Sequence, residues 1–367
     1  MKYILTLFIL IVFTQPFFAQ KGIYRLLVGT YTNTGKSEGI YAYEVDVNTS
    51  TFTQKSVAAG ITNPSFLTLT PDSKFLYAVS ENGENSIVSA FSFEGKTAKM
   101  TLINQSPAKG LDPCYVSASK NHVFTANYNS GSLSVLGRKA DGALTSVLQQ
   151  IQHTGSSINT ERQNEPHVHQ VLFSPDKKYL ITNDLGTDQV IVYKYNSKAD
   201  SGILTPWDTL SVKPGSGPRH AVFSKNGKRL FVLHELDGTV SVLKIQNGRL
   251  SLIQEMTVMR KENKKAGAAD IHLSPDGKFL YASNRAPSTT ITCFSVAKDG
   301  MLEFKQQISS GGNGPRNFAL TPDGQYLFAG NQYSDTIVIF KRDVQTGFLT
   351  DTGKKINVGA PVSLVFF

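Results

Sequence analysis

Short runs in which hydrophobic and polar residues alternate recur along almost the whole chain. Two clear examples are residues 239–243, Thr-Val-Ser-Val-Leu, and residues 336–340, Thr-Ile-Val-Ile-Phe. Alternation with a period of two, many β-branched and aromatic residues, and turns rich in glycine, asparagine and aspartate are typical of β-strands. The pattern therefore predicts an all-β protein.

The predicted strands belong to an internal repeat of roughly fifty residues. Each copy has a proline or small residue, an apolar strand, a turn of the Pro-Asp-Gly type, a returning strand of the Leu-Tyr-Ala type, and two further strands. The first hairpins of six copies lie at residues 63–78, 112–124, 165–180, 217–231, 269–282 and 314–329. Four strands in a unit of this length are the sequence signature of a propeller blade.

The two ends of the chain supply a seventh unit. Residues 360–367 form one inner strand, and residues 26–31, 39–45 and 52–56 supply the three strands that such a blade still needs. Pairing of the ends closes the ring and removes two exposed sheet edges. An open solenoid would need polar caps, which neither end provides. We therefore predict a single seven-bladed β-propeller over residues 20–367.

The first nineteen residues have the pattern of a signal peptide. Lys2 precedes an almost unbroken apolar run over residues 4–13, and Ala19 offers a small residue for cleavage. The run is too short to span a bilayer comfortably, and Gln15-Pro16 follows it. We predict a signal peptide over residues 1–19 and an exported protein, periplasmic or secreted, with no membrane attachment after cleavage.

Charge and cysteine content narrow the partners. The formal net charge is +9, and the basic residues are dispersed rather than gathered in a stripe with aromatics. This argues against nucleic-acid binding and leaves a mild bias toward anionic substrates. Cys114 and Cys293 both lie in strand-like runs, which indicates buried free thiols rather than a disulfide framework. Nothing in the sequence indicates an oligomeric state.

The hairpins predict which polar residues meet at the channel. Residues equally far from a turn are neighbours at the same mouth of an antiparallel hairpin. Three pairs satisfy this count: Arg219 with Glu235, His169 with Asp184, and Arg316 with Gln332. Arg285 follows a returning strand and reaches the same level. Because all inner strands surround one axis, these side chains are expected to converge on one funnel.

Such a funnel suits an anionic ligand and carries an acid/base pair. Arginine presents a planar fork to carboxylates and phosphates. Glu235, beside Arg219, is expected to stay ionised and to accept a proton from water. His169 can act as a base, or as an acid toward a leaving alkoxide. Residues 154–164 show no strand pattern and are expected to lie over the funnel, with Arg162 reaching inward.

Structural roles compete with this interpretation. Propellers commonly tie their blades together with buried polar residues, and that role is equally open for Asn127, Asp184, Asn284 and Asn331. The aspartates of the repeated turns, Asp72, Asp176, Asp276 and Asp323, are turn formers. Arg219, Glu235 and Arg285 differ from the residues at the other predicted mouths, whereas a symmetric structural role would repeat.

Other catalytic templates are missing from the sequence. There is no glycine-rich phosphate loop before a helix. His167 and His169 offer two metal ligands, but no cysteine or acidic cluster completes a zinc set. We therefore expect neither a metal nor a cofactor.

Several motifs carry a family resemblance. They are Arg162-Gln163, Pro166-His167-Val168-His169, Asp184-Leu185-Gly186, Gly217-Pro218-Arg219-His220, His234-Glu235-Leu236, Ala268-Ala269-Asp270-Ile271-His272, Ser283-Asn284-Arg285 and Pro315-Arg316-Asn317-Phe318. Together they resemble the propeller-type lactonase family, which includes 6-phosphogluconolactonases and the eukaryotic carboxymuconate lactonizing enzymes. The resemblance spans nearly the whole mature chain. It implies a seven-bladed fold and an active-site set of His169, Arg219, Arg285 and Glu235, the residues that the hairpins also select.

These observations predict a metal-independent lactonase, a carboxylic ester hydrolase acting on a small anionic lactone. The ring is 6-phosphogluconolactone-like or that of another sugar or carboxylate-bearing lactone; since sugar phosphates are scarce outside the cytoplasm, export makes an unphosphorylated aldonolactone at least as plausible. The predicted catalytic residues are Glu235, His169, Arg219 and Arg285. The predicted substrate-binding residues are His167, His220, Arg316, Gln332 and Arg162. Two alternatives stay open: a non-catalytic propeller that binds a ligand or protein, and a muconate-type lactonizing cycloisomerase.

Overall fold

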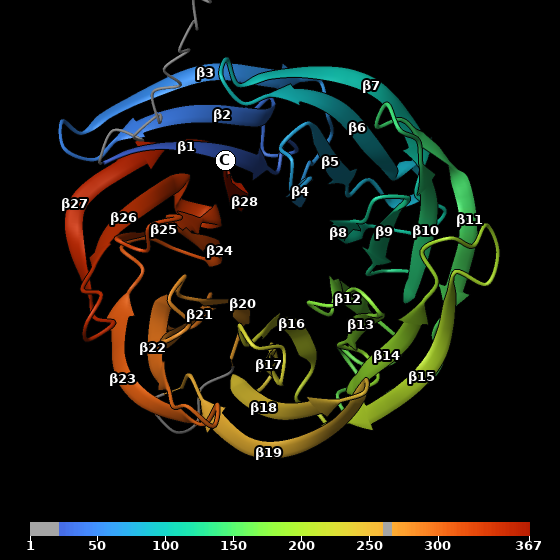
Figure 1. Cartoon of the computed structure of the whole chain (residues 1–367). Helices are drawn as coiled ribbons and strands as arrows, with labels where there is room; N and C mark the ends of the chain where they lie inside the picture. The colour runs from blue at the N-terminus through green and yellow to red at the C-terminus, as the bar shows by residue number, and fades with distance from the viewer. Residues whose placement is uncertain (1–21, 260–265) are drawn as a thin grey trace, which may run out of the picture.

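The chain forms a closed ring of seven blades around a central channel (Figure 1). The computed structural model describes residues 22–259 and 266–367, and within them each blade is a four-stranded antiparallel sheet. The predicted seven-bladed propeller is thereby confirmed. The predicted signal peptide over residues 1–19 lies outside the described residues. No helix in the described part of the chain is long and apolar enough to cross a membrane.

The strands of the first four blades follow one another from the channel outward. Blade 1 contains β28 (Pro361–Phe366), β1 (Ile23–Thr30), β2 (Gly39–Asp46) and β3 (Thr51–Ala59). Blade 2 contains β4 (Leu67–Leu69), β5 (Phe75–Ser80), β6 (Ile87–Glu94) and β7 (Lys99–Pro107). Blade 3 contains β8 (Pro113–Ala118), β9 (His122–Asn127), β10 (Ser132–Arg138) and β11 (Leu144–Gln152). Blade 4 contains β12 (Val168–Phe173), β13 (Tyr179–Asp184), β14 (Gln189–Tyr195) and β15 (Leu204–Ser211).

The remaining blades repeat this order. Blade 5 contains β16 (Pro218–Phe223), β17 (Arg229–His234), β18 (Thr239–Gln246) and β19 (Arg249–Thr257). Blade 6 contains β20 (Ala268–Leu273), β21 (Phe279–Asn284), β22 (Thr290–Val296) and β23 (Leu302–Ser309). Blade 7 contains β24 (Pro315–Leu320), β25 (Tyr326–Asn331), β26 (Thr336–Arg342) and β27 (Leu349–Asn357). Two short 3₁₀ helices, η1 (Gly83–Asn85) and η2 (Gln332–Ser334), lie between strands of blades 2 and 7.

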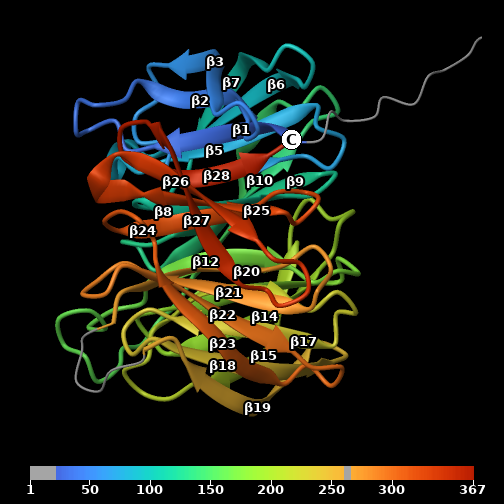
Figure 2. The ribbon, with the colours of Figure 1, turned by 90° about the vertical axis from the view of Figure 1, so that its left-hand side faces the viewer.

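The two ends of the propeller meet in blade 1. Strand β28 is its innermost strand and pairs antiparallel with β1, with Leu26 opposite Phe366 and Val28 opposite Leu364. Figure 2 shows β28 and β1 running side by side near the end of the chain. The closure leaves no blade with an unpaired inner strand in the described residues, as the repeat count predicted.

The hydrophobic core consists of layers between neighbouring blades. In the described residues there is one buried cluster at each of the seven interfaces. Between blades 4 and 5, for example, Ile181 and Val192 pack in the same cluster as Val232. Both faces of a blade are covered, so the middle strands bury alternate residues against two different neighbours: in β2, Ile40 and Ala42 pack toward blade 2, and Tyr41 and Tyr43 pack toward blade 7. Cys114 and Cys293 are buried free thiols within this framework.

Candidate active site

A polar cavity of about 540 Å³ opens where the inner strands begin. Its lining draws on all seven blades and on the loop between blades 3 and 4. The lining residues are Tyr31, Asn33, Thr34, Asn63, Glu81, Asp112, Cys114, Tyr128, Asn129, Arg162, His169, Glu235, Arg285, Arg316 and Gln332. Six of the nine predicted site residues are among them: Arg162, His169, Glu235, Arg285, Arg316 and Gln332.

One ring of lining residues follows the second strand of each blade. In every blade the first residue after that strand donates its backbone N–H to a carbonyl oxygen that lies just before the inner strand. The seven equivalent residues are Tyr31, Glu81, Tyr128, Leu185, Glu235, Arg285 and Gln332. All except Leu185 line the cavity. The repeat therefore holds seven different side chains at the same height around one opening.

A second ring comes from irregularities in the inner strands. The pairing of β16 with β17 passes from Pro218 to His220 and skips Arg219, and the pairing of β24 with β25 skips Arg316 in the same way. Strand β12 skips His169, and β8 skips Cys114. A β-bulge re-aims the side chain of the extra residue. The bulges bring His169, Cys114 and Arg316 to the cavity wall, with Arg219 buried behind it.

Glu235 is the electrostatic centre of the cavity. Its Oε1 accepts a hydrogen bond from Arg162 at 2.8 Å, and its Oε2 accepts one from Arg219 Nε at 2.9 Å. Arg285 forms a third ion pair, 2.9 Å from Oε2. Burial raises the pKa of Glu235, but Arg285, Arg219 and Arg162 outweigh burial and hold the pKa well below its usual range. Glu235 is therefore ionised and fully engaged by guanidinium groups.

Arg219 is the most buried of these arginines, with 1% of its surface exposed. It donates to Glu235 and also to the backbone carbonyl of Ala269 in blade 6. Burial and the nearby charge of Arg285 lower the pKa of Arg219 to about 10, against the opposing effect of Glu235. Arg219 thus lies behind Glu235 as its buried ion-pair partner and is not part of the cavity lining.

The loop before blade 4 reaches into the cavity as the sequence predicts. Arg162 donates to the Tyr128 hydroxyl at 3.0 Å as well as to Glu235, while 42% of its side chain stays exposed. The base of the loop is held to blade 4, since Gln163 donates to the Leu185 carbonyl at 2.8 Å. Arg162 therefore covers Glu235 from the solvent side.

His169 faces the cavity as a neutral imidazole. Its Nδ1 lies 3.6 Å from the Cys114 sulfur, and the residue is buried. Burial lowers the pKa of His169 well below its usual value, and the charge of Arg219, the neighbouring His220 and the charge of Arg316 lower it further. Within the described residues Nε2 has no hydrogen-bond partner, which leaves it available to a ligand.

Three predicted site residues do not line the cavity. Arg219 lies behind Glu235, as described above. His167 stacks on the Tyr128 ring at 4.4 Å, and its Nδ1 lies 3.0 Å from the Tyr128 carbonyl oxygen. His220 lies one residue further into the channel and hydrogen-bonds to Asp270. The structure thus places His167 and His220 behind the lining, not in it.

The predicted contact between His169 and Asp184 is wrong. Asp184 pairs with Val168, because the bulge displaces His169 from the register. Its carboxylate accepts the His167 backbone N–H at 2.8 Å and lies 2.7 Å from His153 Nδ1. Asn127, Asn284 and Asn331 similarly bond within or beside their own blades. These four residues have the structural role that the sequence left open.

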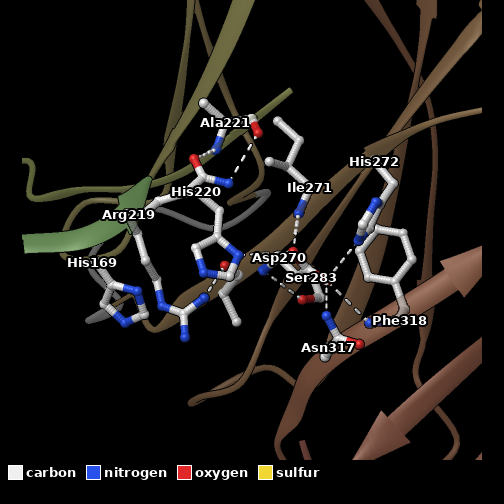
Figure 3. Close-up of polar contacts among 12 residues, drawn as sticks. His169, Arg219, His220, Ala221, Asp270, Ile271, His272, Ser283, Asn317 and Phe318 are labelled. Carbon is white, nitrogen blue, oxygen red and sulfur yellow. Dashed lines mark hydrogen bonds and ion pairs between the residues drawn. The ribbon is translucent and has the colours of Figure 1, made fainter. Parts of the chain in front are cut away.

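Asp270 organises the channel beneath the cavity (Figure 3). The figure shows His220, His272 and Asn317 pointing at its carboxylate from three neighbouring blades. His220 Nδ1 lies 2.9 Å from Oδ1, His272 Nε2 lies 2.8 Å from Oδ2, and Asn317 donates to Oδ2. Burial raises the pKa of Asp270, but His272 and His220 outweigh it and lower the pKa well below its usual range. Sequence reasoning did not single out Asp270 as a functional residue.

The buried histidines predict a pH dependence of stability. Burial lowers the pKa of His220 and His234 to about 4 and lowers that of His169 as well. An unfolded chain binds these protons near pH 6.5, whereas the folded chain does not, so acid favours unfolding. His272 has a raised pKa, and its opposing contribution is present below pH 6.5 and is lost as the pH rises through its folded value.

We therefore expect the free energy of unfolding to fall between about pH 6.5 and pH 4. Urea unfolding at several pH values in this window measures it. An unfolding free energy that stays level or rises on acidification would contradict this assignment, in which His169, His220 and His234 have lowered pKa values and His272 has a raised one.

Sequence reasoning missed two further carboxyl groups in the cavity, those of Glu81 and Asp112. Glu81 holds in blade 2 the place that Glu235 holds in blade 5, and Tyr31 and Tyr128 hold it in blades 1 and 3. The signal was available, because each residue directly follows the Leu-Tyr-Ala-type strand of its repeat. In the described ranges no group of three or more histidine, cysteine or acidic side chains is arranged to hold a metal ion.

The fold and the cavity define a class: a closed seven-bladed propeller with an enzyme-like polar site at one mouth. The family model described as lactonase, 7-bladed beta-propeller, matches residues 25–366. The chain therefore belongs to the seven-bladed propeller lactonase family.

Relatives cover nearly all of this chain. It is 36% identical to a 6-phosphogluconolactonase of Formosa agariphila, covering 93% of this chain and 99% of that one. It is 34% identical to a 6-phosphogluconolactonase of Bacillus subtilis, over 92% and 97%. The structure of a putative 6-phosphogluconolactonase from Bacteroides fragilis superimposes with a TM-score of 0.91 at 39% identity, over 95% and 99%. That of a periplasmic gluconolactonase from Pseudomonas aeruginosa superimposes with a TM-score of 0.88 at 35% identity, over 94% and 99%.

Proposed function

We propose that this protein hydrolyses a small sugar lactone in the polar cavity, with His169 as the base that activates water. The observation that carries the proposal is the pairing of a neutral, cavity-facing imidazole with a cluster of guanidinium groups around one ionised glutamate. The names of the relatives, 6-phosphogluconolactonase and gluconolactonase, support the same reaction class.

The arginines supply the electrostatic part of the reaction. Arg162, Arg285 and Arg316 all line the cavity, and in the proposed mechanism their N–H groups stabilise the charge that develops on the lactone carbonyl oxygen. Both carboxylate oxygens of Glu235 are engaged by guanidinium groups, whereas Nε2 of His169 has no hydrogen-bond partner among the described residues. We therefore assign proton acceptance to His169 and give Glu235 the role of holding the guanidinium groups in place.

The charges of the cavity favour an unphosphorylated substrate. Arg162, Arg219 and Arg285 already pair with Glu235. The guanidinium of Arg316 lies over the Tyr31 ring, 5.3 Å from its centre, and is close enough to Glu81 to act on its charge. A phosphate dianion would have to compete with these groups, whereas the neutral lining residues Asn33, Thr34, Asn63 and Asn129 suit the hydroxyls of an aldonolactone.

The direct test is proton release from a panel of lactones by purified residues 20–367. We expect turnover of glucono-δ-lactone above its spontaneous hydrolysis, and a lower kcat/KM for 6-phosphoglucono-δ-lactone. His169→Gln should lower kcat by about 10²–10⁴-fold, the usual contribution of a general base. The absence of turnover with every aldonolactone tested would contradict the proposal, and ligand binding without turnover would favour a non-catalytic propeller.

We also propose that the protein is exported and cleaved after Ala19. The support is the charge and hydropathy pattern of residues 1–19 and the likeness to a periplasmic gluconolactonase. Expression of the full chain in a Gram-negative host, followed by fractionation and N-terminal sequencing, tests this. A cytoplasmic protein that retains Met1 would contradict export.

A further inference from the structure

Glu81 and Glu235 are equivalent residues of two different blades. Each is the first residue after the second strand of its blade, and their backbone N–H groups donate to the carbonyl oxygens of Asn63 and Gly217, respectively. Both side chains line the same cavity. The propeller repeat therefore presents two carboxyl groups to one ligand site from two different blades.

The two carboxyl groups have different neighbours. Glu235 is engaged by three guanidinium groups. Glu81 instead receives the Tyr31 hydroxyl, whose oxygen lies 3.0 Å from Oε1 and 2.9 Å from Oε2. Among the described residues, Glu81 forms no ion pair at contact distance. Its carboxyl group is therefore not fixed as an anion by arginine.

The surroundings push the two pKa values apart. Burial raises the pKa of Glu81; Arg316, Ser65 and Tyr31 lower it, Asp112 raises it further, and the net shift is upward. The pKa of Glu235 is lowered, as described above. Two carboxyl groups in one site, one kept ionised and one able to hold a proton, are the arrangement found where one carboxyl group acts as the acid.

The other ionisable lining residues are committed elsewhere. Asp112 already accepts the Gly83 backbone N–H at 2.8 Å and the Asn129 amide at 2.5 Å, which fixes it as an acceptor. His169 is the proposed acceptor of the proton from water. The departing ring oxygen needs a proton, since it would otherwise leave as a strongly basic alkoxide, and Glu81 offers a donor besides the protonated His169.

We propose that Glu81 is the general acid of the reaction and donates its proton to the ring oxygen as the lactone opens. The inference rests on the proposed lactonase function. Water loses one proton to His169 and adds to the carbonyl carbon. The bond from that carbon to the ring oxygen then breaks, its electron pair stays on the ring oxygen, and the Glu81 proton completes a hydroxyl group. Proton transfer from His169 through solvent restores Glu81, so one lactone and one water give one hydroxy acid.

The first test is Glu81→Gln, measured on glucono-δ-lactone. We expect kcat to fall by about 10²–10⁴-fold, the usual contribution of a general acid. The matched control is Glu84→Gln, an exposed glutamate three residues later in the same blade that does not line the cavity. This control should keep the wild-type kcat and the wild-type thermal unfolding temperature.

The second test follows the pH dependence of kcat. Because an acid must be protonated, the wild-type kcat should decline as the pH rises through the raised pKa of Glu81, and Glu81→Gln should lose this decline. Tyr31→Phe removes a hydroxyl that stabilises the ionised form of Glu81. The decline should therefore move to higher pH in Tyr31→Phe.

The outcomes separate this inference from the proposed function. Wild-type turnover that persists unchanged in Glu81→Gln would overturn the role of Glu81 and leave the lactonase function standing. If Glu81→Gln does not fold, Tyr31→Phe decides, and an unshifted pH profile there would overturn the role of Glu81. A wild-type protein that opens no lactone would overturn both.

Discussion

Replacing Glu235 with glutamine is expected to lower kcat/KM for lactone hydrolysis by about 10²–10³-fold, the cost of removing one preorganised electrostatic contact from an active site. The glutamine amide keeps the size of the side chain but loses the charge that holds Arg162, Arg219 and Arg285 together. Without it these guanidinium groups repel one another, and Arg162 and Arg285 leave the positions that the proposed mechanism requires.

The measurement is steady-state kinetics on the lactone that the wild type turns over best, together with thermal unfolding. Glu161→Gln is the matched control, because Glu161 is exposed and next to Arg162 in the same loop but does not line the cavity. A Glu235→Gln protein that is folded and as active as the wild type would show that the arginine cluster around Glu235 has no part in the reaction.

The variant Arg285→Ala distinguishes a role of Arg285 in orienting the substrate from a role in the stability of the fold. Arg285 pairs with Glu235, yet the Arg219–Glu235 pair behind it does not depend on that contact. We expect Arg285→Ala to lose activity by about the same 10²–10³-fold while unfolding close to the wild-type temperature. Wild-type activity in both Arg285→Ala and Glu235→Gln would show that the proposed site is wrong.

The repeat made the architecture predictable from the sequence. Strand, turn and strand recur with a fixed order, and each copy alone cannot cover both of its apolar faces, so the copies must pack against one another around a ring. The assignment of the C-terminal strand to blade 1 followed from the same count and is confirmed by the pairing of Leu26 with Phe366. No tertiary detail was needed for this step.

The site was less predictable, because its geometry depends on one extra residue in several inner strands. Counting outward from the turns brought Arg219 near Glu235, but the bulges shift the register and separate His169 from Asp184. A bulge has no reliable signature in a single sequence, since any residue can occupy it. The counting therefore found the right end of the channel and not the orientation of each side chain.

Glu81 and Asp270 escaped the sequence interpretation for different reasons. Glu81 has the repeat position of Glu235, but the place that Arg219 takes in blade 5 is taken by Ser65 in blade 2. Counting outward from the turn therefore found no charged pair there. Asp270 lies in an inner strand between Ala269 and Ile271, where an isolated aspartate has no visible partner. Its partners come from blades 5, 6 and 7, and only the closed ring brings them together.

Asp270→Ala is expected to destabilise the propeller by about 3–5 kcal/mol, the typical cost of removing one partner from a buried ion pair. Asp270 is 3% exposed and accepts hydrogen bonds from Asn317 and from the backbone N–H of Phe318, in addition to its two histidines. Alanine leaves these donors without an acceptor inside the channel. Urea unfolding near pH 7 measures the loss, and Asp200→Asn, at an exposed aspartate, is the control.

The same substitution should also change the chemistry above it. The His220 ring contacts the His169 ring with a centroid distance of 5.1 Å. Without the hydrogen bond to Asp270, the His220 ring is no longer held in one orientation against His169. We expect Asp270→Asn, which keeps the shape and loses the charge, to lower kcat while unfolding between Asp270→Ala and the wild type. An Asp270→Ala protein as stable as the wild type would mean that the free-energy cost of burying the carboxylate equals the gain from its hydrogen bonds and ion pairs. The blades would then be held together by the apolar layers alone.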